Sequence, residues 1–121
     1  GHAEGDETLK KVAHVMGSHA RRPLDIVARY GGEEFVGLWY NLSEADMQTI
    51  LESLRTDIAA LQIPHASSDV APHVSLSIGL AHLQPQAHHT LDDALRLADV
   101  ALYLAKEQGR NRVVLKTPEA S

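Results

Sequence analysis

The sequence predicts an α+β domain in which helices pack on one mainly antiparallel sheet. Two β-prone runs, Ile26–Tyr30 and Phe35–Tyr40, are separated by only four residues and therefore predict a hairpin. The periodicity of the remaining chain gives the order helix, strand, strand, helix, strand, helix, strand. A hairpin combined with separated helices favours an α+β sheet over a doubly wound parallel sheet.

Composition limits the classes of protein to consider. The 121 residues suffice for one domain with a real core, with 44% hydrophobic and 22% charged residues. The net charge of −5 argues against a nucleic-acid or anionic-membrane surface, and the absence of cysteine excludes disulfides and thiol catalysis. No apolar run approaches the roughly 20 residues of a membrane span. We expect a cytoplasmic domain that contacts neither nucleic acid nor membrane, even where its parent protein is membrane-anchored.

The first segment predicts a polar loop, residues 1–6, followed by a helix. Asp6 would cap the N-terminus of this helix and Gly17 would end it. The apolar side chains fall at i, i+3, i+4 and i+7 and define one buried face: Leu9, Val12, Ala13 and Met16.

The hairpin carries a glycine pair followed by an acidic pair. We expect the turn at Gly31 and Gly32, because glycine adopts the positive φ that two-residue turns require. Glycines also let a ligand approach the backbone closely. Glu33 and Glu34 would then begin the outgoing strand, with side chains on opposite faces. Such a pair could hold a metal-bound phosphate, or could simply be a solvated hairpin end.

Helical spacing predicts two further helices. Ser43 with Asp46, and Thr90 with Asp93, have the spacing of capping boxes, and Gly109 would end the second helix. Four alanines would let that helix lie close to a sheet. The apolar positions are Met47, Ile50, Leu51, Leu54, Ile58 and Leu61 in the first helix, and Leu91, Leu95, Ala98, Leu102 and Ala105 in the second.

Two more strands complete the predicted sheet. Residues 74–81 alternate apolar with small or polar side chains, as in a strand with one apolar face. Gly79 within this run indicates a bulge or a close neighbour. Residues 113–115 are enough for one last short strand.

Four segments resemble the motifs of the GGDEF-domain diguanylate cyclases, in the order in which that family has them. They are GHAEGD at 1–6 (GHxxGD), RYGGEEF at 29–35 (the signature hairpin in its GGEEF form), VSLSIG at 74–79 (VTxSIG) and ADVALYLAKEQGRNRV at 98–113 (ADxALYxAKxxGRNRV). The resemblance covers nearly the whole chain. We therefore interpret residues 1–116 as a GGDEF domain and residues 117–121 as a C-terminal tail.

The resemblance implies a nucleotide-cyclase-like palm fold with the hairpin at its active site. The family condenses two GTP molecules into cyclic di-GMP with loss of two pyrophosphates. Two domains face each other as a homodimer, each holding one GTP, and the 3′-hydroxyl of one nucleotide attacks the α-phosphate of the other. Mg²⁺ or Mn²⁺ would neutralise the phosphate charge.

The same resemblance assigns roles to the hairpin residues. Glu33 would bind the metal and help to deprotonate the 3′-hydroxyl, and Glu34 would support the metal site. Gly31 and Gly32 would lie under the nucleotide, and Arg29 would add positive charge near the phosphates.

Residues outside the hairpin would hold the rest of the nucleotide. Asp6 would accept hydrogen bonds from guanine N1 and N2, unless it serves only as a helix cap. Lys106 and Arg110, one helical turn apart, would hold the β- and γ-phosphates. The alternative is that these two cations only match the dipole at a helix C-terminus.

Arg22 and Asp25 form an R-x-x-D tetrapeptide with five residues between it and Gly31. At this position the family has its product-inhibition site, where arginines and a carboxylate grip a cyclic di-GMP dimer. Such a tetrapeptide also occurs by chance in many proteins. Arg55 is a candidate for a further contact.

The family's first helix and first strand precede the GHxxGD segment, and this sequence lacks them. That strand supplies an Asp metal ligand and lies centrally in the sheet, so its loss would uncover sheet edges. We expect the 121 residues to belong to a longer folded domain and to be inactive as a cyclase on their own.

Two functions stay open. The first is a diguanylate cyclase domain with product inhibition at the R-x-x-D site. The second is a non-catalytic regulatory module that binds cyclic di-GMP or GTP. Degenerate signatures mark such modules, and the intact signature at Gly31–Phe35 favours the enzyme.

Overall fold

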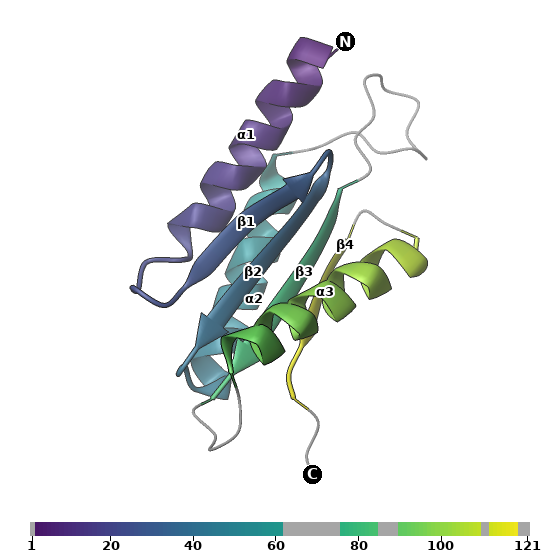
Figure 1. Ribbon diagram of the computed structural model, residues 1–121. Coiled ribbons are helices and arrows are strands. Elements are labelled where there is room, and N and C mark those ends of the chain that lie inside the picture. Colours follow the sequence, from purple (N-terminus) through teal and green to yellow (C-terminus); the bar gives the residue numbers. More distant parts are fainter. Residues whose placement is uncertain (1, 62–75, 85–89, 110–111, 119–121) are drawn as a thin grey trace.

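The computed structural model describes residues 2–61, 76–84, 90–109 and 112–118, with side chains from residue 7 onward. Three helices and four strands make up the described chain (Figure 1). In chain order they are α1 (His2–Ser18), β1 (Ile26–Gly31), β2 (Glu34–Tyr40), α2 (Glu44–Ala60), β3 (Ser77–Leu83), α3 (Leu91–Glu107) and β4 (Arg112–Lys116).

The four strands form one sheet in the order β1-β2-β3-β4. Only the β1–β2 hairpin is antiparallel, whereas β2–β3 and β3–β4 are parallel pairs. The α+β class is confirmed, but the prediction of a mainly antiparallel sheet is wrong. The reason is that α2 and α3 are crossover helices, and each returns the chain to the end of the sheet from which the previous strand started.

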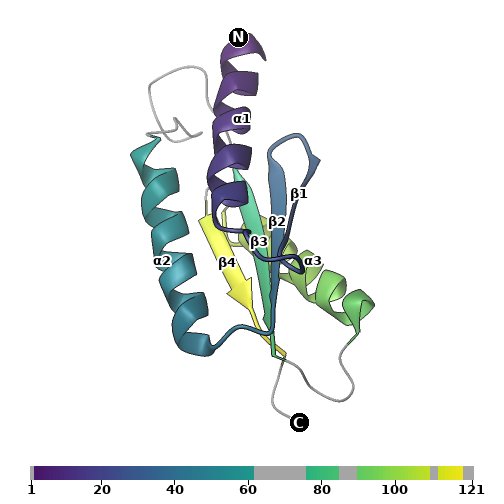
Figure 2. The ribbon, with the colours of Figure 1, turned by 90° about the vertical axis from the view of Figure 1, so that its left-hand side faces the viewer.

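The helices cover both faces of the sheet, with α1 and α2 on one face and α3 on the other (Figure 2). Strand alternation divides the apolar side chains between these two layers. The core under α1 and α2 includes Phe35, Trp39, Ile78 and Leu80, and the core under α3 includes Val36, Leu38, Ala81 and Leu83.

Strand β3 is buried along its whole length. The prediction of a single apolar face for residues 74–81 is therefore wrong, because a central strand covered by helices on both sides has no solvent face. Val74 and Ser75 lie outside the described residues.

Gly79 confirms the prediction of a close neighbour. A Cβ at this position would lie 2.3 Å from the backbone nitrogen of Leu102 and 2.7 Å from the carbonyl oxygen of Ala98. The backbone of α3 thus packs directly on β3. The alanines that allow this approach are all buried: Ala94, Ala98, Ala101 and Ala105.

The capping residues of α2 and α3 are as predicted. Ser43 accepts a hydrogen bond from the backbone nitrogen of Asp46 at 3.1 Å. Thr90 and Asp93 form a reciprocal capping box, with distances of 3.1 and 3.0 Å. Gly109, with φ of 114°, follows the end of α3.

The N-terminal helix differs from the prediction at both ends. It begins at His2 rather than after Asp6, so Asp6 lies inside α1 and is not its N-cap. Ala3 and Glu4 are good helix formers, which helps the helix to extend through this segment. At the other end, α1 runs one residue beyond Gly17, to Ser18.

Within the described segments, none of the helices has the length and apolar character that a bilayer crossing would require.

Candidate functional site

The hairpin turn lies one residue later than predicted, at Gly32 and Glu33. Arg29 pairs with Phe35 and Gly31 pairs with Glu34, so Tyr30 is the extra residue of a bulge that shifts the register. Gly32 has φ of 50°, a conformation that favours glycine. A Cβ added at Gly31 or Gly32 would meet no atom within 4 Å among the described residues, so the surface over the turn is open.

Arg29 reinforces this turn. Its Nε donates a hydrogen bond to the carbonyl oxygen of Gly32 at 2.9 Å, across the top of the hairpin. The guanidinium predicted to lie near phosphates is thus held beside the two signature glycines.

Glu34 and Lys106 form an ion pair between the hairpin and the opposite helix. The Nζ of Lys106, in the last turn of α3, lies 2.5 Å from Oε1 of Glu34, at the start of β2. About a third of each side chain remains exposed. The structure therefore brings together two predicted site residues from different motifs, 72 positions apart in the sequence.

Glu33 occupies the turn itself, and its carbonyl oxygen accepts a hydrogen bond from the backbone nitrogen of Ser77 at 3.0 Å. The two glutamates thus belong to different backbone elements: Glu33 to the turn and Glu34 to strand β2. The prediction that both begin the outgoing strand holds only for Glu34.

The donor set at this turn fits a hard cation. Carboxylate oxygens are the ligands that Mg²⁺ and Mn²⁺ prefer, and Mg²⁺ is commonly held by one or two carboxylates together with substrate phosphates. Across the parts of the chain that the structure describes, no group of three or more histidine, cysteine or acidic side chains gathers as a ready metal cage.

The structure does not describe the side chains of two predicted site residues, Asp6 and Arg110. The backbone of Asp6 lies in α1, but its side chain is outside what the structure describes, and Arg110 lies outside the described residues altogether. Their roles remain predictions.

Arg22 and Asp25 bind each other at the far end of β2 from Glu34. The guanidinium donates to the carboxylate of Asp25 at 2.9 to 3.3 Å, and its other donors reach the carbonyl oxygens of Tyr40 and Asn41, each at 2.7 Å. The Asp25 side chain is only 3% exposed. We call this arrangement of Arg22, Asp25, Tyr40 and Asn41 the clasp. It ties the connector before β1 to the end of β2.

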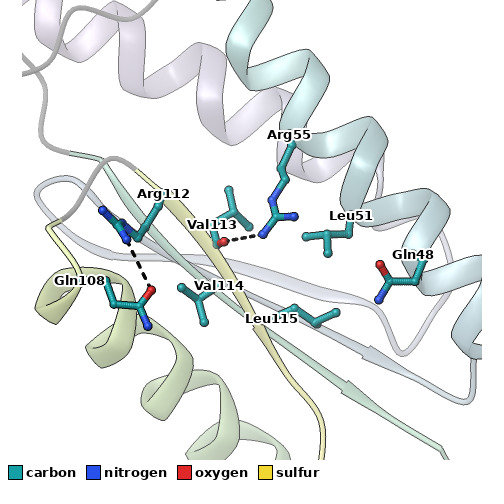
Figure 3. Close-up of a pocket in the computed structure, with 8 residues that line it drawn as sticks. All are labelled: Gln48, Leu51, Arg55, Gln108, Arg112, Val113, Val114 and Leu115. Carbon is teal, nitrogen blue, oxygen red and sulfur yellow. Dashed lines mark hydrogen bonds between the residues drawn. The ribbon is translucent and has the colours of Figure 1, made fainter.

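Arg55 does not join the clasp. Its guanidinium donates to the carbonyl oxygen of Val113 at 2.9 Å, on the free edge of β4 (Figure 3). This contact borders a hollow of about 510 Å³ between α2 and β4, with Arg112 and Gln108 at its other side. Neither Glu34 nor Lys106 lines the hollow. From α2, Arg55 thus satisfies a carbonyl on the edge strand β4 and helps to cover that edge, a role that needs no ligand.

Sequence reasoning missed one contact beside the site. A hydrogen bond to the Asp99 carboxylate, with lesser contributions from burial and the charge of Asp99, raises the pKa of the Tyr30 hydroxyl above its ordinary value of 10.0. Asp99 and Lys106 are seven residues apart and so lie on one face of α3. Asp99 contacts β1 through Tyr30, and Lys106 contacts β2 through Glu34, so α3 contacts both strands of the hairpin. The spacing of Asp99 and Lys106 within their motif was the sequence signal for these two contacts.

The fold and the site define a class: a three-layer α+β domain in which an open glycine turn is followed by a carboxylate, Glu34, that pairs with a lysine, Lys106. The chain belongs to the GGDEF family, because the family's sequence profile, described as "Diguanylate cyclase, GGDEF domain", matches residues 1–112. The recognition made from the four motifs is thereby confirmed.

Proteins similar to this chain carry consistent descriptions. It is 36% identical over 116 residues to the probable diguanylate cyclase DgcT of Escherichia coli K12, and 37% identical over 114 residues to diguanylate cyclase DgcM of the same strain. It is 35% identical over 115 residues to diguanylate cyclase A of Treponema denticola. These matches cover 94 to 96% of this chain but only 25 to 30% of each relative.

A solved structure shares the fold. The GGDEF domain of DgcB from Caulobacter crescentus, crystallised in complex with c-di-GMP, superposes with a TM-score of 0.63 at 31% identity. The match covers 95% of this chain and 66% of that one.

Proposed function

We propose that this chain is the catalytic part of a diguanylate cyclase that condenses two GTP molecules into cyclic di-GMP and two pyrophosphates. Family membership and the names of the relatives support the proposal. The signature Gly31–Phe35 is intact, and a degenerate signature would be expected of a non-catalytic module.

The observation that carries the proposal is the ion pair between Glu34 and Lys106. A site for a nucleoside triphosphate must bring together cationic side chains, which bind the phosphates, and carboxylates, which bind the metal ion. Here a carboxylate of the hairpin and an ammonium of α3 already meet beside an open glycine turn. A bound nucleotide would separate this ion pair, because Lys106 would bind its phosphates and Glu34 would bind its metal ion.

The reaction that we propose has balanced bond changes. The 3′-oxygen of one GTP forms a bond to the α-phosphorus of the other, and the bond from that phosphorus to the bridging oxygen of the β-phosphate breaks. Pyrophosphate leaves with the electron pair of the broken bond. Glu33 accepts the proton of the 3′-hydroxyl. A second, identical step closes the ring.

A divalent cation, Mg²⁺ or Mn²⁺, supplies neutralisation of the negative charge that builds up on the phosphates. Glu33 and Glu34 would hold it. Lys106 and Arg110 would hold the β- and γ-phosphates, and Arg29 would add positive charge at the turn. Each residue supplies an oxygen ligand or a charge-assisted donor suited to its proposed partner.

Binding of guanine and pairing of two domains complete the proposal. Asp6 would accept hydrogen bonds from guanine N1 and N2. Since each domain holds one GTP, two copies must face each other, and we propose a homodimer as the active form.

Arg22 and Asp25 are proposed as the product-inhibition site. Arginine can donate to phosphate and guanine edges in a fork, as cyclic di-GMP would require. In the described state these donors are occupied by Asp25 and by the carbonyls of Tyr40 and Asn41. The product would therefore have to take over part of the clasp, which predicts a modest rather than a very tight inhibitory affinity.

A second candidate is a regulatory module that binds cyclic di-GMP without making it. One observation favours binding as such: the DgcB domain, to which this chain is similar, was crystallised with c-di-GMP. Both candidates would bind cyclic di-GMP, but only the cyclase would convert GTP into it.

The deciding experiment incubates the full-length protein that carries this chain with GTP and Mg²⁺ and separates the products by chromatography. We expect cyclic di-GMP and pyrophosphate from the wild type, and none from Glu33→Gln. The matched control is Glu52→Gln, because Glu52 is an exposed glutamate on α2, away from the hairpin. Cyclic di-GMP binding without any product would establish the regulatory module instead.

A further inference from the structure

Ser77, the first residue of β3, is fully buried, and its hydroxyl has no hydrogen-bond partner among the described residues. Its backbone nitrogen is satisfied by the carbonyl oxygen of Glu33, so only the side chain lacks a partner. A buried hydroxyl without a partner is unfavourable, and alanine would fill this position at less cost. The hydroxyl is therefore expected to find a partner in another state of the site.

Ser77 has two register partners, Glu34 on β2 and Arg112 on β4, and of these two side chains only the Glu34 carboxylate can accept a hydrogen bond from the Ser77 hydroxyl. Alternation places Ser77 and Glu34 on the face covered by α3, because Val36 and Ala81, further along the two strands, pack in the cluster under α3. Register partners on one face have Cβ atoms roughly 5 Å apart. A rotation of either side chain could bring the hydroxyl to the carboxylate.

Glu34 is at present held by Lys106. Building on the proposed function, we propose that Ser77 is a positioning residue for Glu34. When Lys106 turns to the phosphates of a bound nucleotide, the Ser77 hydroxyl donates a hydrogen bond to the Glu34 carboxylate in its place. The exchange keeps the carboxylate oriented after its cation has left.

A neutral donor suits this role chemically. Lysine on Glu34 neutralises the carboxylate and competes with a divalent cation for its oxygens. A hydroxyl fixes the orientation of the carboxylate and leaves its full negative charge for the metal. The serine would thus favour the state in which nucleotide and cation are both bound.

A thermodynamic cycle on the full-length protein that carries this chain tests the exchange without any nucleotide. In the wild type, Ser77→Ala should leave the melting temperature unchanged or raise it, because the hydroxyl has no partner to lose. In the Lys106→Met background, Ser77 should already have moved to Glu34, and the same change should lower the melting temperature by about 3 °C. An equal change in both backgrounds would overturn the proposal.

A second measurement examines the loaded site in the full-length protein. Binding of Mn²⁺ in the presence of a non-hydrolysable GTP analogue can be followed by electron paramagnetic resonance. Ser77→Ala should weaken Mn²⁺ binding roughly tenfold, while Ser53→Ala on α2 should not. Wild-type affinity in Ser77→Ala would overturn the proposal. Failure of the wild type to bind the nucleotide would count against the proposed function, and the melting cycle would still decide the role of Ser77.

Discussion

The ammonium of Lys106 lies 2.5 Å from a carboxylate oxygen of Glu34 and joins the last turn of α3 to the first residue of β2. Both groups are partly exposed, and such pairs contribute only about 0–1 kcal/mol to stability. The pair therefore matters more for the placement of charge at the hairpin than for the fold.

Replacement of Lys106 separates these two effects. Lys106→Met should lower kcat/KM for GTP by roughly 10- to 100-fold, because a charge-assisted contact to phosphate is lost. Its free energy of unfolding should change by less than about 1 kcal/mol. Steady-state kinetics and urea unfolding check the two halves. Lys11→Met, an exposed lysine on α1, is the control and should leave both values unchanged.

The clasp predicts a structural cost for changes at Arg22. Arg22→Ala should lower the free energy of unfolding by about 1–3 kcal/mol, because it leaves the buried Asp25 carboxylate without its arginine. The single tryptophan, Trp39, is fully buried and gives a fluorescence signal for the transition. Arg21→Ala, at the exposed neighbouring position, should have no such effect; an equal loss in both variants would contradict the clasp.

The same pair of variants tests inhibition. Product inhibition should be lost in Arg22→Ala and kept in Arg21→Ala, measured as the initial rate against added cyclic di-GMP. Because Arg22→Ala is expected to destabilise the fold, rates should be compared only at temperatures where both variants are folded. Unchanged inhibition in folded Arg22→Ala would remove the R-x-x-D assignment.

Close packing of α3 on β3 predicts opposite effects of one substitution at two glycines. Gly79→Ala should destabilise the domain by about 1–3 kcal/mol, since the new methyl group would collide with the backbone of α3. Gly17→Ala should be neutral or stabilise by up to about 1 kcal/mol, because Gly17 is helical and a methyl group there meets nothing within 4 Å. Denaturant unfolding of the two variants decides. A tolerated Gly79→Ala would contradict the packing.

Tyr30 should make the stability of the domain depend on pH in the alkaline range. Its pKa in the folded state lies above the ordinary 10.0, so the protonated hydroxyl is favoured by folding. The resulting stabilisation is complete below about pH 10 and is lost as pH rises through the folded-state pKa. In urea unfolding between pH 8 and 11, Tyr30→Phe should therefore lose less stability than the wild type above pH 10. Tyr103→Phe, on the exposed side of α3, should follow the wild type.

Local features of the fold were predictable from the sequence because their signals are local. The caps at Ser43 and Thr90 depend on residues three positions away, and the structure confirms both. The parallel pairing of β2 with β3 was not predictable in this way. It depends on α2 returning the chain to the end of the sheet where β2 began and on β3 then lying beside β2, and contacts between distant residues set that arrangement. The turn was misplaced by one residue because the bulge at Tyr30 is a property of the paired strands.

The site shows the same division. Motif resemblance placed Glu34 and Lys106 in one site, and the structure brings them into contact. It could not predict that Arg22 also binds the carbonyls of Tyr40 and Asn41, because that contact requires the end of β2 to lie beside the connector before β1. Ser77 carried no signal of its own beyond its place in the motif. Its burial without a partner became visible only in the packed sheet.

We propose that the hairpin and the last turn of α3 form one nucleotide site. A crystal structure of the full-length protein with a non-hydrolysable GTP analogue and Mg²⁺ would locate the nucleotide. We predict that the Nζ of Lys106 leaves Glu34 and lies about 3 Å from a β- or γ-phosphate oxygen, over the turn at Gly32. A nucleotide bound elsewhere, with the pair between Lys106 and Glu34 intact, would show that the hairpin and α3 do not form its site.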